Sequence, residues 1–121
     1  MKQDLIPASH LSKGHCVPCE GGVDPLTRAE FAPYLEIVKD WTVASDEKSI
    51  ERNFKFKDFK QALTFVNKIG EIAESEGHHP DINLHGWNKV RITLSTHAIK
   101  GLSINDFVVA SKIDLIPQTT L

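Results

Sequence analysis

Residues 58–77 read DFKQALTFVNKIGEIAESEG and carry the strongest structural signal in the chain. Asp58 has the position of a helix cap, with Gln61 following at the spacing typical of a helix start. Apolar side chains recur at helical spacing and predict one buried face, made of Phe59, Ala62, Leu63, Val66, Ile69 and Ala73. Because Gly77 readily adopts the left-handed conformation that ends helices, we expect an amphipathic helix running to about Glu76.

A pair of strands is expected directly after this helix. The segments DINLH at 81–85 and KVRITLST at 89–96 alternate polar and apolar residues around a glycine-containing turn at 86–88. Such alternation is typical of strands with one face buried, and the short link is typical of a hairpin. The predicted core face of the second strand consists of Val90, Ile92 and Leu94.

Two further helices are predicted on either side of this region. Within residues 26–38, Thr27 and Glu30 have the spacing of a capping box, in which each side chain bonds the backbone N–H of the other residue. Pro33 argues against a fully regular helix there, because proline removes one backbone hydrogen bond. The last helix is expected to start at Ser103.

A first hairpin is expected between the first two helices, with strands at 41–44 and 50–56 around the polar residues 45–48. The predicted order is therefore αββαββα. Because the strands come in adjacent pairs, we expect an α+β two-layer sandwich, in which a four-stranded antiparallel sheet is covered on one face by three helices. Open sheet edges favour oligomerisation.

Length and charge limit the classes of protein to which this chain can belong. The chain of 121 residues suits one domain, predicted at 26–115, with a flexible N-terminal arm at 1–25 and a C-terminal tail at 116–121. Its 14 basic and 16 acidic residues form no basic stripe, so we expect no direct nucleic acid partner. No apolar run approaches the roughly 20 residues that span a bilayer, and no signal peptide is evident, so we expect no membrane partner and a cytoplasmic location.

The predicted arm contains Cys16 and Cys19, preceded by His10 and His15. Four such side chains match the ligand number of a structural zinc site, but zinc fingers separate two ligand pairs by a dozen or so residues. A redox pair is disfavoured because no strand precedes the cysteines, as a thioredoxin-like motif requires. We therefore interpret the segment as a flexible arm and expect no metal site.

Histidines gather at the end of the long predicted helix. His78 and His79 follow its last turn, and Pro80 then forces His79 into an extended conformation, so the two rings are expected to diverge. Imidazole is the side chain best suited to proton transfer near neutral pH. Glu74 lies four residues before His78 and is expected to orient that ring, with Asp81 as another possible partner.

His97 is expected at the end of the strand RITLSTH, on its polar side. Divergent adjacent histidines make a shared metal ion awkward, and no helical His-x-x-x-His pair is present. Acid and base catalysis without a metal therefore fits His78, His79 and His97 better. His85 alternates with polar residues along its strand and is interpreted as a surface residue.

The spacing Glu74-x3-His78-His79-Pro80-x6-Trp87-x9-His97-x8-Asp106 resembles the signature of the pterin-4a-carbinolamine dehydratases. The stretches FKFKDFKQALTFVNKIGEIAESEGHHPDI, THAIKGLSINDFVVASKID and CVPCEGGVDPLT are similar to bacterial members, and the likeness covers about residues 14–115. It implies a helix-covered antiparallel sheet, a homodimer or homotetramer, and removal of water from 4a-hydroxytetrahydrobiopterin in tetrahydrobiopterin recycling. It also implies that the pterin is the substrate and that no cofactor is needed.

The resemblance also implies roles for particular residues. His78 and His97 would transfer protons, His79 would hold the substrate near its hydroxyl group, and Glu74 would orient an imidazole. The residues expected to line the polar edge of the pterin are Pro80, Ser95 and Thr96. Trp87 suits packing at least as well as binding, and Asp106 is interpreted as a helix-start residue rather than a catalyst.

One departure from animal members is an additional residue near His85 and Gly86, for which we expect a β-bulge. Animal relatives also serve as dimerisation partners of a homeodomain transcription factor, so a non-catalytic binding role is one alternative. The same chemistry on another pterin, as in molybdopterin metabolism, is a second alternative.

Overall fold

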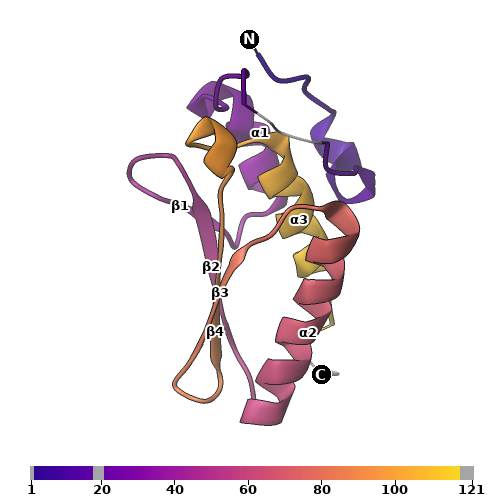
Figure 1. The fold of residues 1–121 in the computed structure, drawn as a ribbon, viewed down its shortest axis with the longest axis vertical. Helices are drawn as coiled ribbons and strands as arrows, with labels where there is room; N and C mark the ends of the chain where they lie inside the picture. Colours follow the sequence, from indigo (N-terminus) through magenta and orange to yellow (C-terminus); the bar gives the residue numbers. More distant parts are fainter. Residues whose placement is uncertain (1, 18–20, 118–121) are drawn as a thin grey trace.

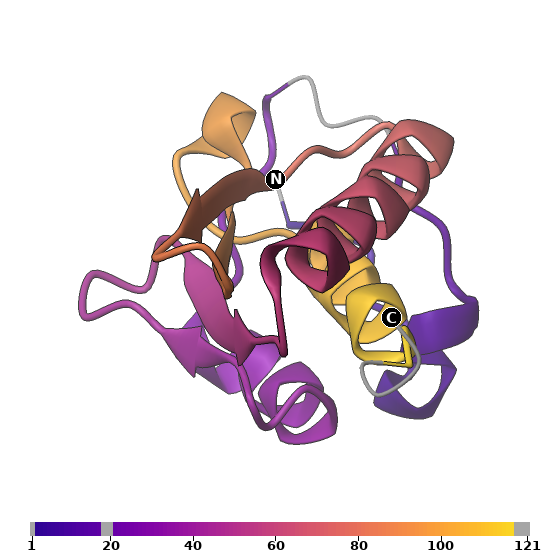
Figure 2. The ribbon, with the colours of Figure 1, turned by 90° about the horizontal axis from the view of Figure 1, so that it is seen from below.

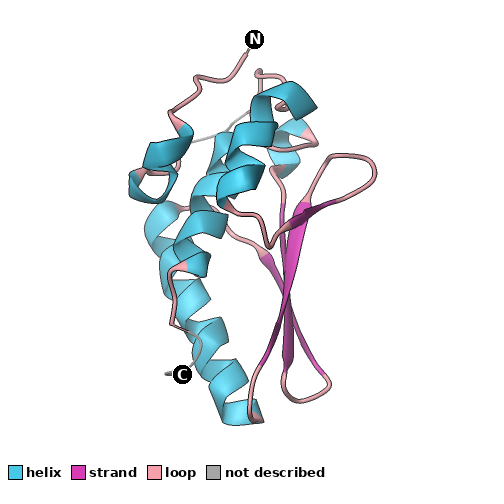
Figure 3. Ribbon diagram, turned by 180° about the vertical axis from the view of Figure 1, so that it is seen from behind, coloured by secondary structure: helices cyan, strands magenta, loops and turns pink. Residues whose placement is uncertain are grey.

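The computed structural model describes residues 2–17 and 21–117 and forms two layers, a sheet and a set of helices on one of its faces (Figures 1 and 3). The strands are antiparallel in the order β1-β2-β4-β3 and comprise β1 Thr42–Val43, β2 Ile50–Lys55, β3 Asp81–His85 and β4 Lys89–Leu94. The α-helices are α1 Arg28–Ile37, α2 Phe59–Glu76 and α3 Ile104–Asp114, and two short 3-10 helices are η1 Ala8–Lys13 and η2 His97–Ile99. The predicted α+β fold and its αββαββα order are confirmed.

Local sequence signals set the ends of the helices. The Thr27–Glu30 capping box is present at the start of α1, and the side chain of Asp58 accepts a hydrogen bond from the Gln61 N–H at the start of α2. Gly77 ends α2 with a φ of 66°, a left-handed conformation that glycine adopts without steric cost. The direction in which the chain leaves α2 is therefore fixed by residues within one turn.

The core lies between the sheet and the helices, and it corrects the predicted face of α2. The side chains of α2 that are buried are Ala62, Phe65, Ile69 and Ala73. Phe65 packs against Phe54 and Phe56 of the sheet side, with ring centroids 4.6 and 4.9 Å away. This aromatic cluster rotates the buried stripe, so the predicted core residues Phe59 and Leu63 are instead 50% and 41% exposed.

Helix α3 is the centre of the helical layer, where it contacts α1, α2 and η1 (Figure 2). Its side chains are buried nearly all round, unlike those of an amphipathic surface helix. Part of its cover is the segment predicted as a flexible arm: Leu11 of η1 is 1% exposed, and the Ile6 N–H donates to the Tyr34 hydroxyl at 3.0 Å. The described part of the arm thus packs on the domain, while the boundary at residue 25 and the tail remain predictions.

Hairpin β3–β4 runs in continuous register up to the pair His85↔Lys89, and a turn at 86–88 closes it. The expected bulge near His85 and Gly86 is wrong, because the turn absorbs the extra residue with positive φ angles at Gly86 (54°) and Trp87 (57°). No helix in the described ranges is long and apolar enough to cross a membrane.

Candidate active site

The three histidines predicted to act together lie around one cavity of about 490 Å³. His78 and His79 come from the turn after α2, whereas His97 comes from the start of η2. The cavity is open to solvent and is lined by residues that follow the end of α2 and the end of β4. Figure 1 shows that these two ends of the chain elements lie in the same half of the molecule. Segments distant in the sequence therefore bring the imidazoles together, as the expectation of a shared site required.

His78 points inward. The N–H of Gly77 and the N–H of His78 both bond the Ala73 carbonyl, at 2.8 and 3.3 Å, which closes the C-terminal end of α2. The side chain of His78 is only 12% exposed, and its Nε2 lies 2.6 Å from Oδ1 of Asp106, whose side chain is fully buried. A hydrogen bond this short between buried groups fixes the imidazole ring in one orientation.

Asp106 has two structural partners besides His78. Its Oδ2 accepts from the Ser103 N–H and from the Thr96 hydroxyl, both at 2.9 Å. The first of these bonds completes the capping box of α3, so the prediction of a helix-start residue is correct. Sequence reasoning missed that the other carboxylate oxygen of Asp106 holds His78. Its place in the family signature was the one signal that pointed to such a role.

The Asp106 pairing assigns the proton on His78. An ionised carboxylate only accepts hydrogen bonds, so the Nε2 of His78 carries a hydrogen and donates it to Oδ1. The other ring nitrogen, Nδ1, has no hydrogen-bond partner among the described residues. A carboxylate in this position sets the tautomer of the imidazole that it holds.

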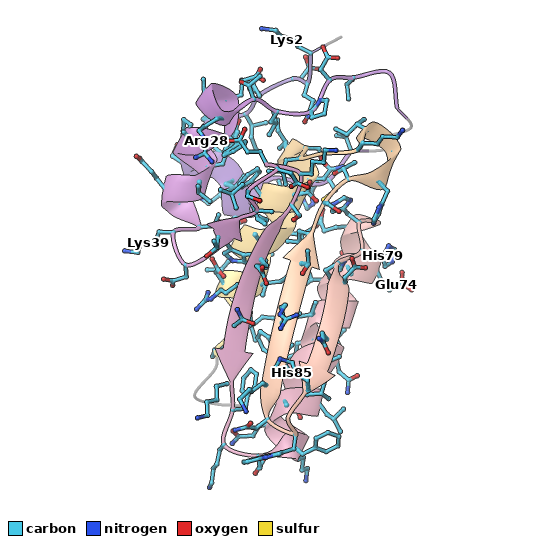
Figure 4. All side chains as sticks on the ribbon, turned by 90° about the vertical axis from the view of Figure 1, so that its left-hand side faces the viewer. Lys2, Arg28, Lys39, Glu74, His79 and His85 are labelled. Atoms are coloured by element: carbon cyan, nitrogen blue, oxygen red, sulfur yellow. The ribbon has the colours of Figure 1, made fainter. Side chains whose placement is uncertain are left out.

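His79 has the opposite environment. Its Nε2 lies 3.0 Å from Oε2 of Glu74, and the two side chains are 61% and 81% exposed (Figure 4). The prediction that Glu74 orients His78 is therefore wrong. The left-handed Gly77 interrupts the i, i+4 alignment of the helix, so that His78 turns inward and His79 comes within reach of Glu74.

His97 lies beyond the strand that was predicted to carry it. Strand β4 ends at Leu94, Thr96 forms an isolated bridge with Gly101, and His97 begins η2. The side chain of His97 is exposed and lines the cavity. Ser95 also lines the cavity, while the Thr96 hydroxyl is occupied by Asp106 and by Ser103 Oγ at 2.7 Å.

Other predicted residues lie away from the cavity. Neither Pro80 nor Glu74 is among the described residues that line it. His85 is at the far end of the sheet from His79 (Figure 4). Trp87 is 60% exposed in the β3–β4 turn, so it neither packs in the core nor lines the cavity.

Sequence reasoning missed six of the described residues that line the cavity: Cys16, Val17, Glu76, Gly77, Ala98 and Asn105. For Cys16 and Val17, the signal that pointed to this segment was the likeness of CVPCEGGVDPLT to bacterial members. Burial, together with the negative charges of Glu76 and Asp106, raises the pKa of the Cys16 thiol to about 12. The thiol therefore stays protonated and is a poor nucleophile. Cys19 lies outside the described residues, within which no group of three potential ligands could hold a metal ion.

Fold and site together define a class: a small α+β protein with an open cavity lined by histidines and backed by a buried aspartate. The chain belongs to the pterin-4a-carbinolamine dehydratase family, since the family described as "Pterin 4 alpha carbinolamine dehydratase" matches residues 24–116. This finding confirms the resemblance stated from the sequence signature.

Individual relatives agree with this assignment. A protein of Aromatoleum aromaticum named "Putative pterin-4-alpha-carbinolamine dehydratase" is 46% identical over 112 residues, covering 93% of this chain and 99% of that protein. A protein of Alkaliphilus metalliredigens with the same name is 49% identical over 107 residues, covering 88% and 95%. The crystal structure of a "transcriptional coactivator/pterin dehydratase from Brucella Melitensis" matches with a TM-score of 0.70 and 33% identity, covering 75% of this chain and 96% of that one.

Proposed function

We propose that this protein eliminates water from 4a-hydroxytetrahydrobiopterin to give quinonoid dihydropterin, in the recycling of tetrahydrobiopterin. The observation that carries the proposal is the convergence of His78, His79 and His97 on one cavity of a size suited to a bicyclic ligand. Membership of the dehydratase family supports the reaction class.

The elimination needs one proton removed and one proton supplied. A base takes the hydrogen from ring nitrogen N5, the electron pair forms the C4a=N5 double bond, and the C4a–O bond breaks as an acid protonates the departing hydroxyl. The sum is loss of one water molecule, with no oxidation or reduction. Each positioned proton transfer contributes about 10²- to 10⁴-fold in rate.

His78 and His97 are the proposed proton-transfer groups, acting from different elements of the cavity. Asp106 would favour the imidazolium form of His78 at the moment of proton transfer, since a buried carboxylate beside an imidazole stabilises the positive charge. His97 is free to follow the substrate because its exposed ring has no hydrogen-bond partner among the described residues. Which of the two acts as base and which as acid is left open.

The remaining contacts are proposed for binding. His79 would hold the substrate near its hydroxyl group, with Glu74 orienting the ring. Ser95 would offer its side chain to the polar edge of the pterin. Because the Thr96 hydroxyl already bonds two partners, Thr96 would contribute through its backbone, and Pro80 through the chain direction that it imposes after His79. No metal or cofactor takes part in this scheme.

We also propose a cytoplasmic homo-oligomer, either a dimer or a tetramer. The sheet leaves β1 and β3 as edge strands, and edge strands are commonly covered by a second chain. Light scattering coupled to size exclusion would measure the mass in solution, and a monomer at micromolar concentration would contradict this part of the proposal.

A second candidate function is non-catalytic binding of a protein partner. The name of the Brucella melitensis structure, which includes the words "transcriptional coactivator", suggests this alternative. A binding-only protein does not depend on three histidines at a cavity. Replacing His78 or His97 would leave such a protein unimpaired. A third candidate, the same reaction on another pterin, would appear as a preference for that pterin when several 4a-hydroxytetrahydropterins are compared.

The direct test is an assay of 4a-hydroxytetrahydropterin dehydration with the purified full chain. We expect catalysis above the spontaneous rate and a loss of about a hundredfold or more in turnover for His78→Ala and for His97→Ala, with the fold retained. His85, at the far end of the sheet from His79, supplies the matched histidine control, and His85→Ala should leave the rate of dehydration unchanged. Wild-type rates in both cavity variants would end the catalytic assignment.

A further inference from the structure

The cavity has a second side that the proposed chemistry does not use. Besides the histidines, Cys16 and Val17 line the cavity. We call these two residues the N-terminal wall. They precede the family match, which begins at residue 24, and reach the cavity only because the chain is tied back across α2 and α3.

The first tie is Glu76, the last residue of α2. Its side chain is 5% exposed, and its Oε1 accepts from the Cys16 N–H at 2.8 Å. Its Oε2 lies 3.3 Å from the Lys112 Nζ of α3 and 3.2 Å from the His15 Nδ1. A carboxylate at a helix C-terminus is disfavoured by the helix dipole, and burying it costs more. These partners offset both costs.

The balance of these effects is visible in the ionisation of Glu76. Burial acts to raise the pKa of this carboxyl, but hydrogen bonds from Cys16, His15 and Lys112 outweigh it, so the pKa lies below its ordinary value. Glu76 is therefore charged at neutral pH. This charged, nearly buried carboxylate is stabilised by Lys112 of α3 and by the N-terminal segment that it binds.

The second tie is Asn105, in the first turn of α3. Its side chain is bonded at both ends to one residue: Oδ1 accepts from the Val17 N–H at 3.0 Å, and Nδ2 donates to the Val17 carbonyl at 2.7 Å. Asn105 is 3% exposed and adjoins Asp106, the partner of His78. The wall is thus fixed to the same turn that orients the catalytic imidazole.

We propose that the N-terminal wall binds the pterin and sets its affinity, with Glu76 and Asn105 as positioning residues that hold the wall in place. This inference rests on the proposed function, which it deepens. Val17 is 66% exposed and presents an apolar side chain at the cavity, and the Cys16 thiol is uncharged. The wall therefore offers non-polar contact to the bicyclic ring, while His78 and His97 carry out proton transfer.

The expected loss of affinity follows from the fraction of molecules in which the N-terminal wall is in place. A wall that is in place only about a tenth of the time weakens apparent affinity about tenfold, since a ligand binds only the competent fraction. Glu76→Ala and Asn105→Ala should each therefore raise both KM and the Kd for a tetrahydropterin that lacks the 4a-hydroxyl group by about tenfold, with kcat changed less than about twofold. Glu76→Gln keeps an acceptor for the Cys16 N–H and should give a smaller rise.

Val17→Ala tests the wall without touching either tie. It should raise Kd about threefold through lost apolar contact. The matched controls are Glu71→Ala and Asn67→Ala on the exposed side of α2, which should leave KM and Kd unchanged. Circular dichroism melting establishes that every variant is folded, and each retains Leu11, which anchors the N-terminal segment.

Amide hydrogen exchange of peptides covering residues 14–17 reports the ties directly. We expect faster exchange in Glu76→Ala and Asn105→Ala, and slower exchange in the wild type when the tetrahydropterin is added. Faster exchange with unchanged KM and Kd would overturn the inference, because the segment would then be tied without touching the ligand. A fall in kcat with KM unchanged would also overturn it.

Failure of the proposed function gives a different result. A wild-type chain that binds the tetrahydropterin but does not catalyse dehydration refutes the dehydratase proposal alone, and the comparison of Kd values still decides on the wall. A wild-type chain that neither binds nor dehydrates refutes both.

Discussion

Two adjacent histidines of this protein each face a carboxylate, yet their surroundings differ completely. His78 and Asp106 are 12% and 0% exposed, whereas His79 and Glu74 are 61% and 81% exposed. An ion pair in water is worth at most about 1 kcal/mol, while removing one partner of a buried pair leaves an unsatisfied polar group that costs several times more. Burial, rather than the type of residue, separates the positioned imidazole from the adaptable one.

The largest effect is expected from breaking the buried pair. The Asp106 carboxylate accepts hydrogen bonds from Ser103, Thr96 and His78 with its two oxygens. In Asp106→Asn the amide has only one acceptor oxygen, so it cannot satisfy all three donors and also keep the hydrogen of His78 on Nε2. We expect kcat to fall by about a hundredfold or more. Steady-state kinetics measure this loss, and a kcat within about threefold of wild type would show that Asp106 serves only the helix cap.

A second substitution should weaken the contact between His78 and Asp106 without removing either residue. Thr96→Val deletes one donor to Oδ2 of Asp106 and keeps the shape of the side chain. We expect a loss of about 1–2 kcal/mol in the free energy of unfolding, measured by chemical denaturation. A variant as stable as the wild type would indicate that the Ser103 N–H alone satisfies Oδ2.

The dependence of stability on pH extends the comparison of buried and exposed carboxylates to a further buried one, Glu76. Its pKa is lower when folded than its ordinary 4.5, because hydrogen bonds outweigh burial. The stability that it contributes is therefore fully present above pH 4.5 and is lost as the pH falls through the folded pKa. Glu76→Gln should flatten the acid side of the stability profile, measured by melting temperature against pH.

Asp114 is the control, because its pKa shifts in the direction opposite to that of Glu76. Burial raises the pKa of Asp114, even though Trp41 and Arg52 donate hydrogen bonds to it. The folded protein therefore holds this proton more tightly than the unfolded chain, and stability from this group declines as the pH rises past 3.8. Asp114→Asn should remove that decline. Profiles that shift in the same direction for both variants would contradict the two assignments.

The smallest effect is expected from the exposed pair. Glu74→Gln should change the free energy of unfolding by less than about 0.5 kcal/mol and KM by less than about threefold, because both side chains are solvated. A hundredfold loss of activity would show that substrate binding buries Glu74 and His79, and the contrast with Asp106 would disappear.

The sequence predicted most of the architecture because the relevant signals act over short distances. The cap at Asp58 and the stop at Gly77 operate within one helical turn, and the strand pairs follow from alternation. Errors arose where a distant contact intervened. The cluster of Phe65 with Phe54 and Phe56 displaced Phe59 and Leu63 from the predicted core of α2.

For the candidate site too, some features were predictable from the sequence and others were not. The spacing of His78, His79 and His97 pointed to a shared site through the family signature, before any contact was known. The partner of each imidazole was not predictable, since one left-handed residue, Gly77, sends His78 and His79 in different directions. Helical spacing assigned Glu74 to the wrong ring for that reason.

By itself, the sequence determined the order of the elements, the limits of the helices and the three histidines of the candidate site. Caps, turns and periodic burial depend on residues close together in the chain. Only the tertiary structure decided that Asp106 holds His78 across 28 positions and that Glu76 holds Cys16 across 60. Such pairs depend on how helices and loops pack, and burial then gives each contact its strength.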